Sequence, residues 1–181
     1  ALFARLIDGL YTEALVMDPA ASTSASLVIV TPDGERSFIH SLGANGEFCE
    51  KDIRYDVVAR SKIVFVAGTM LMPAFDGADC ALFLQKCKQM GKITALDTAW
   101  DAQGRWMRVL EPCMPYIDYF LPSYEEARML SGKDDPDEMA DVFLSLGPHT
   151  VVIKLGSDGC LIRTKDGLRH QIPTFDRIQA V

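Results

Sequence analysis

The chain has 181 residues, which is enough for one domain with a sizeable hydrophobic core. Its formal net charge of −7 argues against a charge-driven grip on nucleic acid or on an anionic membrane surface. No apolar run reaches the roughly 20 residues of a membrane span. The sequence does not start with the charged, apolar and small-residue segments of a secretion signal. We therefore expect a cytoplasmic protein with no nucleic-acid or membrane partner.

Both ends of the sequence look cut. The chain begins without Met inside a predicted helix, Leu2–Leu10, and stops within an apolar run, Ile178–Val181. We therefore expect a single domain over residues 1–181 that is truncated at both ends.

The hairpin signal near the start of the chain comes from two β-rich runs, Ser26–Thr31 and Arg36–Ser41. A Pro-Asp-Gly segment between them is typical of a tight turn. In the second run Phe38 and His40 share one face, because side chains alternate along a strand. A loop containing Asn45 follows. The alternation predicts a small subsidiary sheet, outside the main sheet of the protein.

From residue 52 onward, predicted helices alternate with uninterrupted apolar strands. The predicted strands are Ile63–Ala67, Ile93–Leu96, Ile117–Leu121 and Val151–Leu155. The predicted helices are Asp52–Ala59, Asp76–Met90, Trp106–Leu110, Ser123–Leu130 and Pro136–Leu146. Such alternation predicts an α/β fold with a mainly parallel sheet that is covered on both faces.

Small or polar residues follow four of the predicted strands. They are Gly68-Thr69, Asp97-Thr98, Ser123 and Gly156-Ser157. Open α/β sheets bind ligands outside the carboxyl ends of their strands, so these residues mark the expected ligand edge. The segment Gly156–Gly159 is consistent with a tight hairpin turn. The same segment can also form a bare backbone surface that a phosphate or a flat base can approach, although the stretch by itself favours the turn.

The five cysteines contain no Cys-x-x-Cys pair of the kind that binds zinc or carries out redox chemistry. Cys80 and Cys87 are seven residues apart, on one face of a predicted helix. We expect both to be free, buried thiols of a reducing compartment. The three histidines fit no metal-ligand spacing.

Four segments, in order, resemble the PfkB family of ribokinase-like carbohydrate kinases. They are TPDGERSFIHSLGAN, DYFLPSYEEARMLSG, VVIKLGSDGCLI and FDRIQAV. The resemblance covers nearly the whole chain. It implies a ribokinase-like three-layer α/β/α sandwich with a mainly parallel central sheet and a small β lid within about residues 14–45.

The resemblance implies ATP-dependent phosphorylation of a sugar hydroxyl, with ATP and Mg²⁺ as cofactors. It places Ser123, Lys154, Gly156 and Gly159 beside the nucleotide and assigns Glu126 to magnesium, through water. Glu126 also completes a capping box with Ser123, so a purely structural role stays open. Lys154 has the alternative of a solvent-facing strand residue, and Gly159 that of a turn residue. Ser123 stands where the family usually has Asn.

On the sugar side, the resemblance makes Phe38, His40 and Asn45 candidate contacts of the substrate. His40 has the alternative of a polar surface residue, and Asn45 that of a capping or turn residue. Asp97, at a strand end on the expected ligand edge, is a candidate contact of the sugar or of the nucleotide. The lid is expected to exclude water and can also form a homodimer contact. The catalytic Asp of the family belongs to a Gly-x-Gly-Asp signature expected just after Val181. The glycine-rich sugar-binding segment expected before residue 1 is absent as well. We therefore expect the chain alone to be inactive.

Two alternatives differ in class. A non-catalytic binding or regulatory relative of the same fold is favoured by Ser123, and a Gly-x-Gly-Asp beyond Val181 would favour the enzyme. A nicotinamide-dependent Rossmann enzyme lacks the strand-linked Gly-x-Gly-x-x-Gly it needs. The sugar or nucleoside that is phosphorylated stays open.

Overall fold

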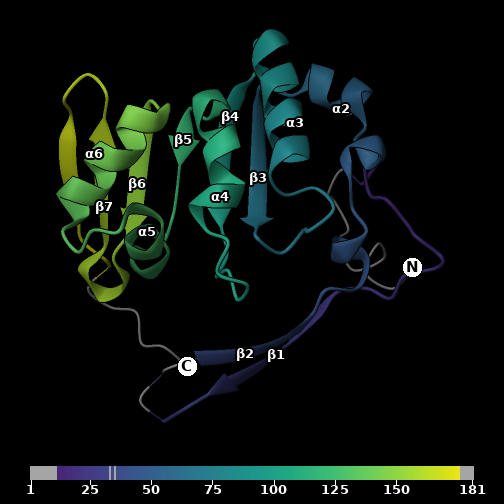
Figure 1. Cartoon of the computed structure of the whole chain (residues 1–181), viewed down its shortest axis with the longest axis horizontal. Helices are drawn as coiled ribbons and strands as arrows, with labels where there is room; N and C mark the ends of the chain where they lie inside the picture. The colour runs from purple at the N-terminus through teal and green to yellow at the C-terminus, as the bar shows by residue number, and fades with distance from the viewer. Residues whose placement is uncertain (1–11, 33, 35, 176–181) are drawn as a thin grey trace.

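The structure, a computed structural model, describes residues 12–32, 34 and 36–175. The predicted helix Leu2–Leu10 and the run Ile178–Val181 lie outside these residues. The described residues contain one two-stranded sheet and one six-stranded sheet (Figure 1).

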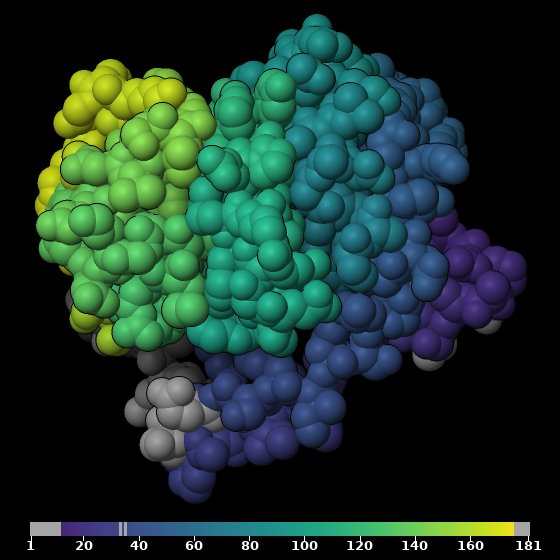
Figure 2. Space-filling view, in the orientation of Figure 1, coloured from purple at the N-terminus to yellow at the C-terminus, as the bar shows by residue number. Residues whose placement is uncertain are grey.

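The two-stranded sheet is the predicted hairpin. Strands β1 (Ala25–Val30) and β2 (Arg36–Ser41) pair antiparallel over their whole length and make no pair with the larger sheet. The hairpin projects from the body of the molecule (Figure 2). The prediction of a subsidiary sheet is confirmed. Apolar side chains on both faces of the hairpin are exposed, namely Leu27, Val28, Ile29, Val30, Phe38 and Ile39.

Three short helices follow the hairpin: η1 (Gly43–Gly46), η2 (Glu50–Asp52) and α2 (Tyr55–Arg60). The prediction of a helix over Asp52–Ala59 was wrong about its first residue, because α2 begins at Tyr55. The Asp52 carboxylate accepts the backbone N–H of Cys49 at 2.9 Å, and Ile53 is extended. This local hydrogen bond competes with helix initiation, which moves to Tyr55.

The six-stranded sheet has its strands in sequence order. They are β3 (Ile63–Thr69), β4 (Ile93–Thr98), β5 (Tyr119–Phe120), β6 (Thr150–Lys154), β7 (Cys160–Thr164) and β8 (Arg169–Ile172). The first four run parallel, and β7 and β8 each pair antiparallel with the preceding strand. The sheet is therefore mixed and mainly parallel, as predicted.

The helices connecting these strands are α3 (Ala78–Gln89), α4 (Met107–Leu110), η3 (Glu111–Tyr116), α5 (Tyr124–Ser131) and α6 (Pro136–Leu146). A single 3₁₀ turn, η4 (Gly156–Asp158), joins β6 to β7. When adjacent parallel strands follow one another in the sequence and each crossover is right-handed, all the connecting helices lie on the same face of the sheet. Figure 1 shows the helices over one face of the sheet. None of the described helices has the length and apolar character needed to cross a membrane.

The core lies between these helices and the face of the sheet that they cover. Leu96 and Phe120 point into it from β4 and β5, and Leu84 and Phe143 reach it from α3 and α6. The rings of Phe120 and Phe143 meet edge to face with centroids 5.0 Å apart.

On the opposite face, the described residues leave apolar side chains open. Ile63 on β3 is the register partner of Ile93 on β4, and Phe65 on β3 and Tyr119 on β5 are the partners of Ala95 between them. The side chains of Ile63, Phe65, Ile93 and Tyr119 are 42–58% exposed. The sequence predicted cover on both faces. The described residues supply one helical layer, because the sequential strand order sends all of their crossovers to the same side.

Burial of the cysteines gives a testable expectation. Cys80, Cys87 and Cys113 are buried, whereas Cys49 and Cys160 are half-buried, and all five are free. Contact with Cys113 and burial raise the pKa of the Cys80 thiol, and burial raises that of Cys87. The thiolate is the reactive form, so the buried thiols should react slowly. Timed iodoacetamide labelling with peptide mapping should find Cys49 and Cys160 modified first. Early modification of Cys80 or Cys87 in the folded protein would contradict this packing.

Candidate active site

The carboxyl ends of the parallel strands meet at one edge of the sheet. Thr69 at the end of β3 is the register partner of Thr98 at the end of β4. Ser123, which follows β5, forms a parallel bridge with Lys154 at the end of β6. The expectation that the four strand ends share one edge is confirmed.

The first turn of α5 brings Ser123 and Glu126 together in a capping box. Glu126 Oε2 accepts the backbone N–H of Ser123 at 2.9 Å, and Ser123 Oγ accepts the N–H of Glu126 at 3.4 Å. Thr98 Oγ1 donates a further hydrogen bond to Glu126 Oε2, at 3.0 Å. Glu126 is 9% exposed, so these bonds hold an acidic side chain at the inner wall of the edge.

Lys154 and Asp97 form an ion pair across the edge. Lys154 Nζ lies 2.7 Å from Asp97 Oδ1, and the two side chains are 44% and 29% exposed. The pair spans β5, because Asp97 is on β4 and Lys154 on β6. Sequence analysis placed Lys154 beside the nucleotide and Asp97 beside the sugar or the nucleotide, and the structure brings their side chains into contact.

The two glycines of the turn after β6 differ in their surroundings. Gly156 has a φ of +59°, and a Cβ there would meet no atom within 4 Å. Gly159 has a φ of +82°, and a Cβ there would collide with the carbonyl oxygen of Ile172. Gly159 is therefore needed for the turn and for close packing of β8, whereas Gly156 leaves a bare backbone open to a ligand.

A surface pocket of about 640 Å³ opens beside this turn. Its lining residues are Ser123, Tyr124, Glu125, Pro136, Lys154, Leu155, Gly156, Asp158 and Gln171. Sequence reasoning missed Tyr124 and Gln171. Gln171 reaches the pocket only because the β7–β8 hairpin folds back along β6, and nothing in its local pattern signals this position.

Buried ionic contacts fix the loops at the same edge. Asp101 Oδ2 accepts the backbone N–H of Trp106 at 2.8 Å, and Arg105 pairs with Asp101 at 3.3 Å. Arg105 Nη2 also donates to the carbonyl of Met70 at 3.1 Å, and Asp76 accepts the Met70 N–H at 3.1 Å. Met70 has a φ of +88°, a strained conformation for a residue with a side chain. The network holds this strained turn in place.

The pKa values of the two carboxylates in the network, Asp76 and Asp101, shift in opposite directions. Burial raises the pKa of Asp76 above its usual range, against hydrogen bonds from the backbone of Met70 and Met72. For Asp101 burial acts in the same direction, but backbone N–H groups and Arg105 outweigh it and lower the pKa. Asp101 is therefore the firmly ionised partner of Arg105.

The other substrate candidates lie elsewhere. Asn45 lines a pocket of about 540 Å³, together with Phe48 and Met72. Phe38 is exposed on the projecting hairpin, and His40 Nδ1 lies 2.7 Å from Ser26 Oγ on the neighbouring strand. Among the described residues, no hydrogen bond or ion pair joins His40 to Asp97, whose partner is Lys154.

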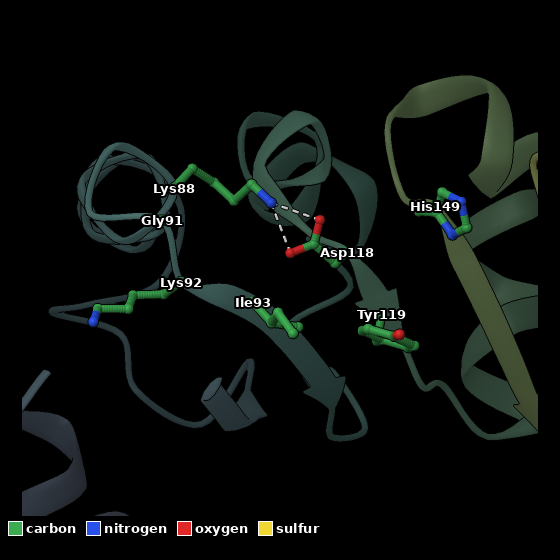
Figure 3. A pocket seen from close by; sticks show the side chains of 7 residues that line it. All are labelled: Lys88, Gly91, Lys92, Ile93, Asp118, Tyr119 and His149. Atoms are coloured by element: carbon green, nitrogen blue, oxygen red, sulfur yellow. Dashed lines mark hydrogen bonds and ion pairs between the residues drawn. The ribbon is translucent and has the colours of Figure 1, made fainter. Parts of the chain in front are cut away.

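A further pocket of about 360 Å³ lies at the opposite edge of the sheet, where the parallel strands begin (Figure 3). Its charged groups are already satisfied. Lys88 Nζ binds both carboxylate oxygens of Asp118, at 2.6 and 2.7 Å. Lys92 Nζ donates to the carbonyls of Ala59 and Ser61. This pocket therefore offers no free charge of the kind that a phosphate requires.

The edge formed by the carboxyl ends of the strands fits a magnesium ion that also binds water and phosphate. It does not fit a metal ion whose ligands are all protein side chains. The described residues contain no group of three or more His, Cys, Asp or Glu side chains that can hold a metal ion. Magnesium is commonly bound through one or two carboxylates, with waters and substrate phosphates completing its shell. The side chain of Glu126 fits this mode of binding, because both of its hydrogen bonds use Oε2 and leave Oε1 as an acceptor.

The exposed ion pair should contribute little to stability. Because Asp97 and Lys154 both contact solvent, we expect a coupling free energy below about 1 kcal/mol. A double-mutant cycle with Asp97→Asn and Lys154→Met, measured by denaturant unfolding at low and high salt, checks this. A coupling of several kcal/mol that persists in high salt would make the pair a structural element.

Comparison with known proteins gives the family. The pfkB family carbohydrate kinase model matches residues 7–181. A ribokinase of Staphylococcus aureus is 26% identical over 166 residues, covering 88% of this chain and 51% of the relative. A 2-dehydro-3-deoxygluconokinase of Bacillus subtilis is 28% identical over 82 residues, covering 42% of this chain and 25% of the relative.

Among solved structures, a ribokinase from Thermotoga maritima superimposes with a TM-score of 0.68 at 27% identity, covering 89% of this chain and 51% of its own. The chain spans about half the length of the two ribokinases. These matches agree with the mainly parallel sheet described above. The chain belongs to the pfkB family of carbohydrate kinases and has a ribokinase-like α/β fold.

Proposed function

We propose that the protein transfers the terminal phosphoryl group of ATP to a hydroxyl group of a sugar. The observation that carries the proposal is the meeting, at one edge of the sheet, of a lysine, a bare glycine backbone and a carboxylate with one free oxygen. Phosphoryl transfer depends on positioning and charge stabilisation more than on covalent chemistry by the protein. Lys154, Gly156 and Glu126 are the groups that such positioning requires.

The phosphates of the nucleotide would lie against Lys154 and Gly156. Lys154 is a mobile positive charge whose partner Asp97 is partly exposed, so an incoming phosphate can compete for it. Gly156 presents backbone without a side chain in the way. The neighbouring pocket provides room for the rest of the nucleotide, with Tyr124 and Pro136 as its apolar wall and Ser123 at its rim. Gly159 does not contact the nucleotide in this proposal, and it allows the turn to pack against the backbone of Ile172.

Glu126 would hold magnesium, directly or through water, with Oε1. Bound magnesium neutralises charge on the phosphates as the phosphoryl group transfers. The residues of this chain contribute by holding a carboxylate and an ammonium group in fixed positions around the phosphates. The capping box keeps Glu126 at the edge, and Lys154 meets the phosphates from the next strand.

The sugar would be held by Asp97 at the edge and by Asn45 in its own pocket. The hairpin that carries Phe38 and His40 would close over it and exclude water. The general base, by family resemblance an Asp in a Gly-x-Gly-Asp signature, would accept the proton of the sugar hydroxyl. It is expected beyond residue 181, so the assay requires the protein at the length of its kinase relatives.

A non-catalytic relative is the second candidate, and one contact favours it. Ser123 occupies the position where the family usually has Asn, and its Oγ is engaged with the N–H of Glu126. A hydroxyl reaches less far toward a phosphate than an amide does. An assay of sugar-dependent ADP release across sugars and nucleosides separates the two. Nucleotide binding without turnover of any substrate supports the non-catalytic relative.

The magnesium role of Glu126 predicts the effect of Glu126→Gln. The substitution removes the charge but keeps an acceptor for Ser123 and Thr98, so α5 should remain capped. We expect the magnesium concentration for half-maximal rate to rise about tenfold or more, as is typical when a metal site is disturbed. Sugar KM and thermal stability should change little.

The matched control is Glu138→Gln, which removes the same charge from an exposed position on α6. It should leave the magnesium requirement unchanged. An unaltered magnesium requirement in Glu126→Gln would assign Glu126 to the helix cap alone.

We also propose that the hairpin forms a homodimer contact. The support is its apolar surface, since Ile39 is 62% exposed and its neighbours on both strands are also open to solvent. Ile39→Ser should shift the protein toward monomer in sedimentation velocity. Leu82→Ser, at an exposed apolar position on α3, is the control and should leave the oligomeric state unchanged. Equal behaviour of both variants would contradict the proposed contact.

A further inference from the structure

We infer that Thr98 positions Glu126 for magnesium, by holding one carboxylate oxygen inside the protein so that the other is presented at the ligand edge. The inference rests on the proposed function, because it concerns the metal bound with the nucleotide. Thr98 is a positioning residue in this account, since its hydroxyl contacts Glu126 and not the substrate.

The geometry that carries the inference is a shared acceptor. Glu126 Oε2 receives the Thr98 hydroxyl at 3.0 Å and the Ser123 N–H at 2.9 Å. These donors come from different elements, the end of β4 and the N-cap of α5. No hydrogen bond within the described part of the chain uses Oε1. The carboxylate is therefore anchored at one oxygen and free at the other.

A single hydrogen-bond donor would not fix the orientation of the Glu126 carboxylate. The last torsion of a Glu side chain is broad, so a carboxylate held by a single bond can rotate and exchange its two oxygens. The other half of the capping box is long, at 3.4 Å, and constrains the backbone more than the carboxylate. A second donor from the buried strand end supplies the missing restraint, because Thr98 is itself buried.

Thr69 provides a natural control beside Thr98. The two residues are register partners at the ends of β3 and β4, and both are buried. Thr69 Oγ1, however, is buried without a hydrogen-bond partner among the described residues. Replacing each by Val removes a hydroxyl and keeps the shape. Only the change at Thr98 takes a donor away from Glu126.

The experiment compares Thr98→Val, Thr98→Ser and Thr69→Val with the unmodified protein. Calorimetric titration with ADP at a series of magnesium concentrations gives the magnesium needed for half-maximal nucleotide affinity. Amide hydrogen exchange at Ser123 reports the anchoring of Oε2 in the absence of any ligand. If Thr98→Val fails to fold, Thr98→Ala is measured in its place with the same expectations.

We expect Thr98→Val to raise the half-maximal magnesium concentration about tenfold, within the range usual for groups that orient a metal ligand. Exchange at Ser123 should become faster in the same variant. Thr98→Ser keeps the donor and should behave like the unmodified protein, and so should Thr69→Val.

Failure of the inference and failure of the proposed function give different results. If the unmodified protein requires magnesium for ADP binding and Thr98→Val has the same requirement as Thr69→Val, the positioning role is overturned while the proposed function stands. If the unmodified protein binds no ADP, or binds it equally in EDTA, the proposed function is overturned and the metal role of Thr98 with it. Faster exchange at Ser123 would then assign the Thr98 hydroxyl to the helix cap.

Discussion

The sequential parallel order of β3, β4, β5 and β6 is the constraint on which the rest of the structure depends. Right-handed crossovers then place the connecting helices on one face and all four carboxyl ends at one edge. Residues that are up to 85 positions apart, from Thr69 to Lys154, become neighbours along this edge without any long-range side-chain contact having to bring them there. The candidate active site is a direct result of the strand order.

The carboxyl edge of the sheet combines a side chain held in place, Glu126, with an ion pair that a ligand can separate, Lys154 and Asp97. Glu126 is buried and held by donors from β4 and from the N-cap of α5, so its position is set before any ligand arrives. Lys154 and Asp97 are more exposed, and their attraction is screened by solvent. In the proposed function, a phosphate would therefore replace Asp97 at Lys154 at small cost, whereas Glu126 would keep its place. Such an arrangement suits a site that must bind and release a charged nucleotide.

Much of the fold could be predicted from local patterns. The hairpin, the alternation of helices and apolar strands, and the capping box of Ser123 and Glu126 all have short-range signals, and the structure contains them. The start of α2 was missed because the Asp52 carboxylate binds the Cys49 N–H, an outcome that propensity alone does not predict. Cover on only one face of β3–β5 follows from strand order, which the apolar runs do not encode.

The site was predicted less completely than the fold. The resemblance to the PfkB family selected Glu126, Lys154 and Gly156, whereas local patterns marked only the strand ends, the glycine turn and the capping box. Neither revealed that Thr98 donates to Glu126, because the two residues are 28 positions apart and only the pairing of β4 with β5 brings them together. The difference between Gly156 and Gly159 was equally hidden, since it depends on where the backbone of Ile172 passes.

The central claim is that nucleotide and magnesium bind at the carboxyl edge between β4 and β6. The most direct test is to map the amide NMR shifts of the protein on titration with a slowly hydrolysed ATP analogue and magnesium. The account predicts the largest changes at Gly156, Ser157 and Lys154, with changes at Glu126 that require magnesium. Changes centred instead on Lys92 and His149, at the opposite edge of the sheet, would contradict it.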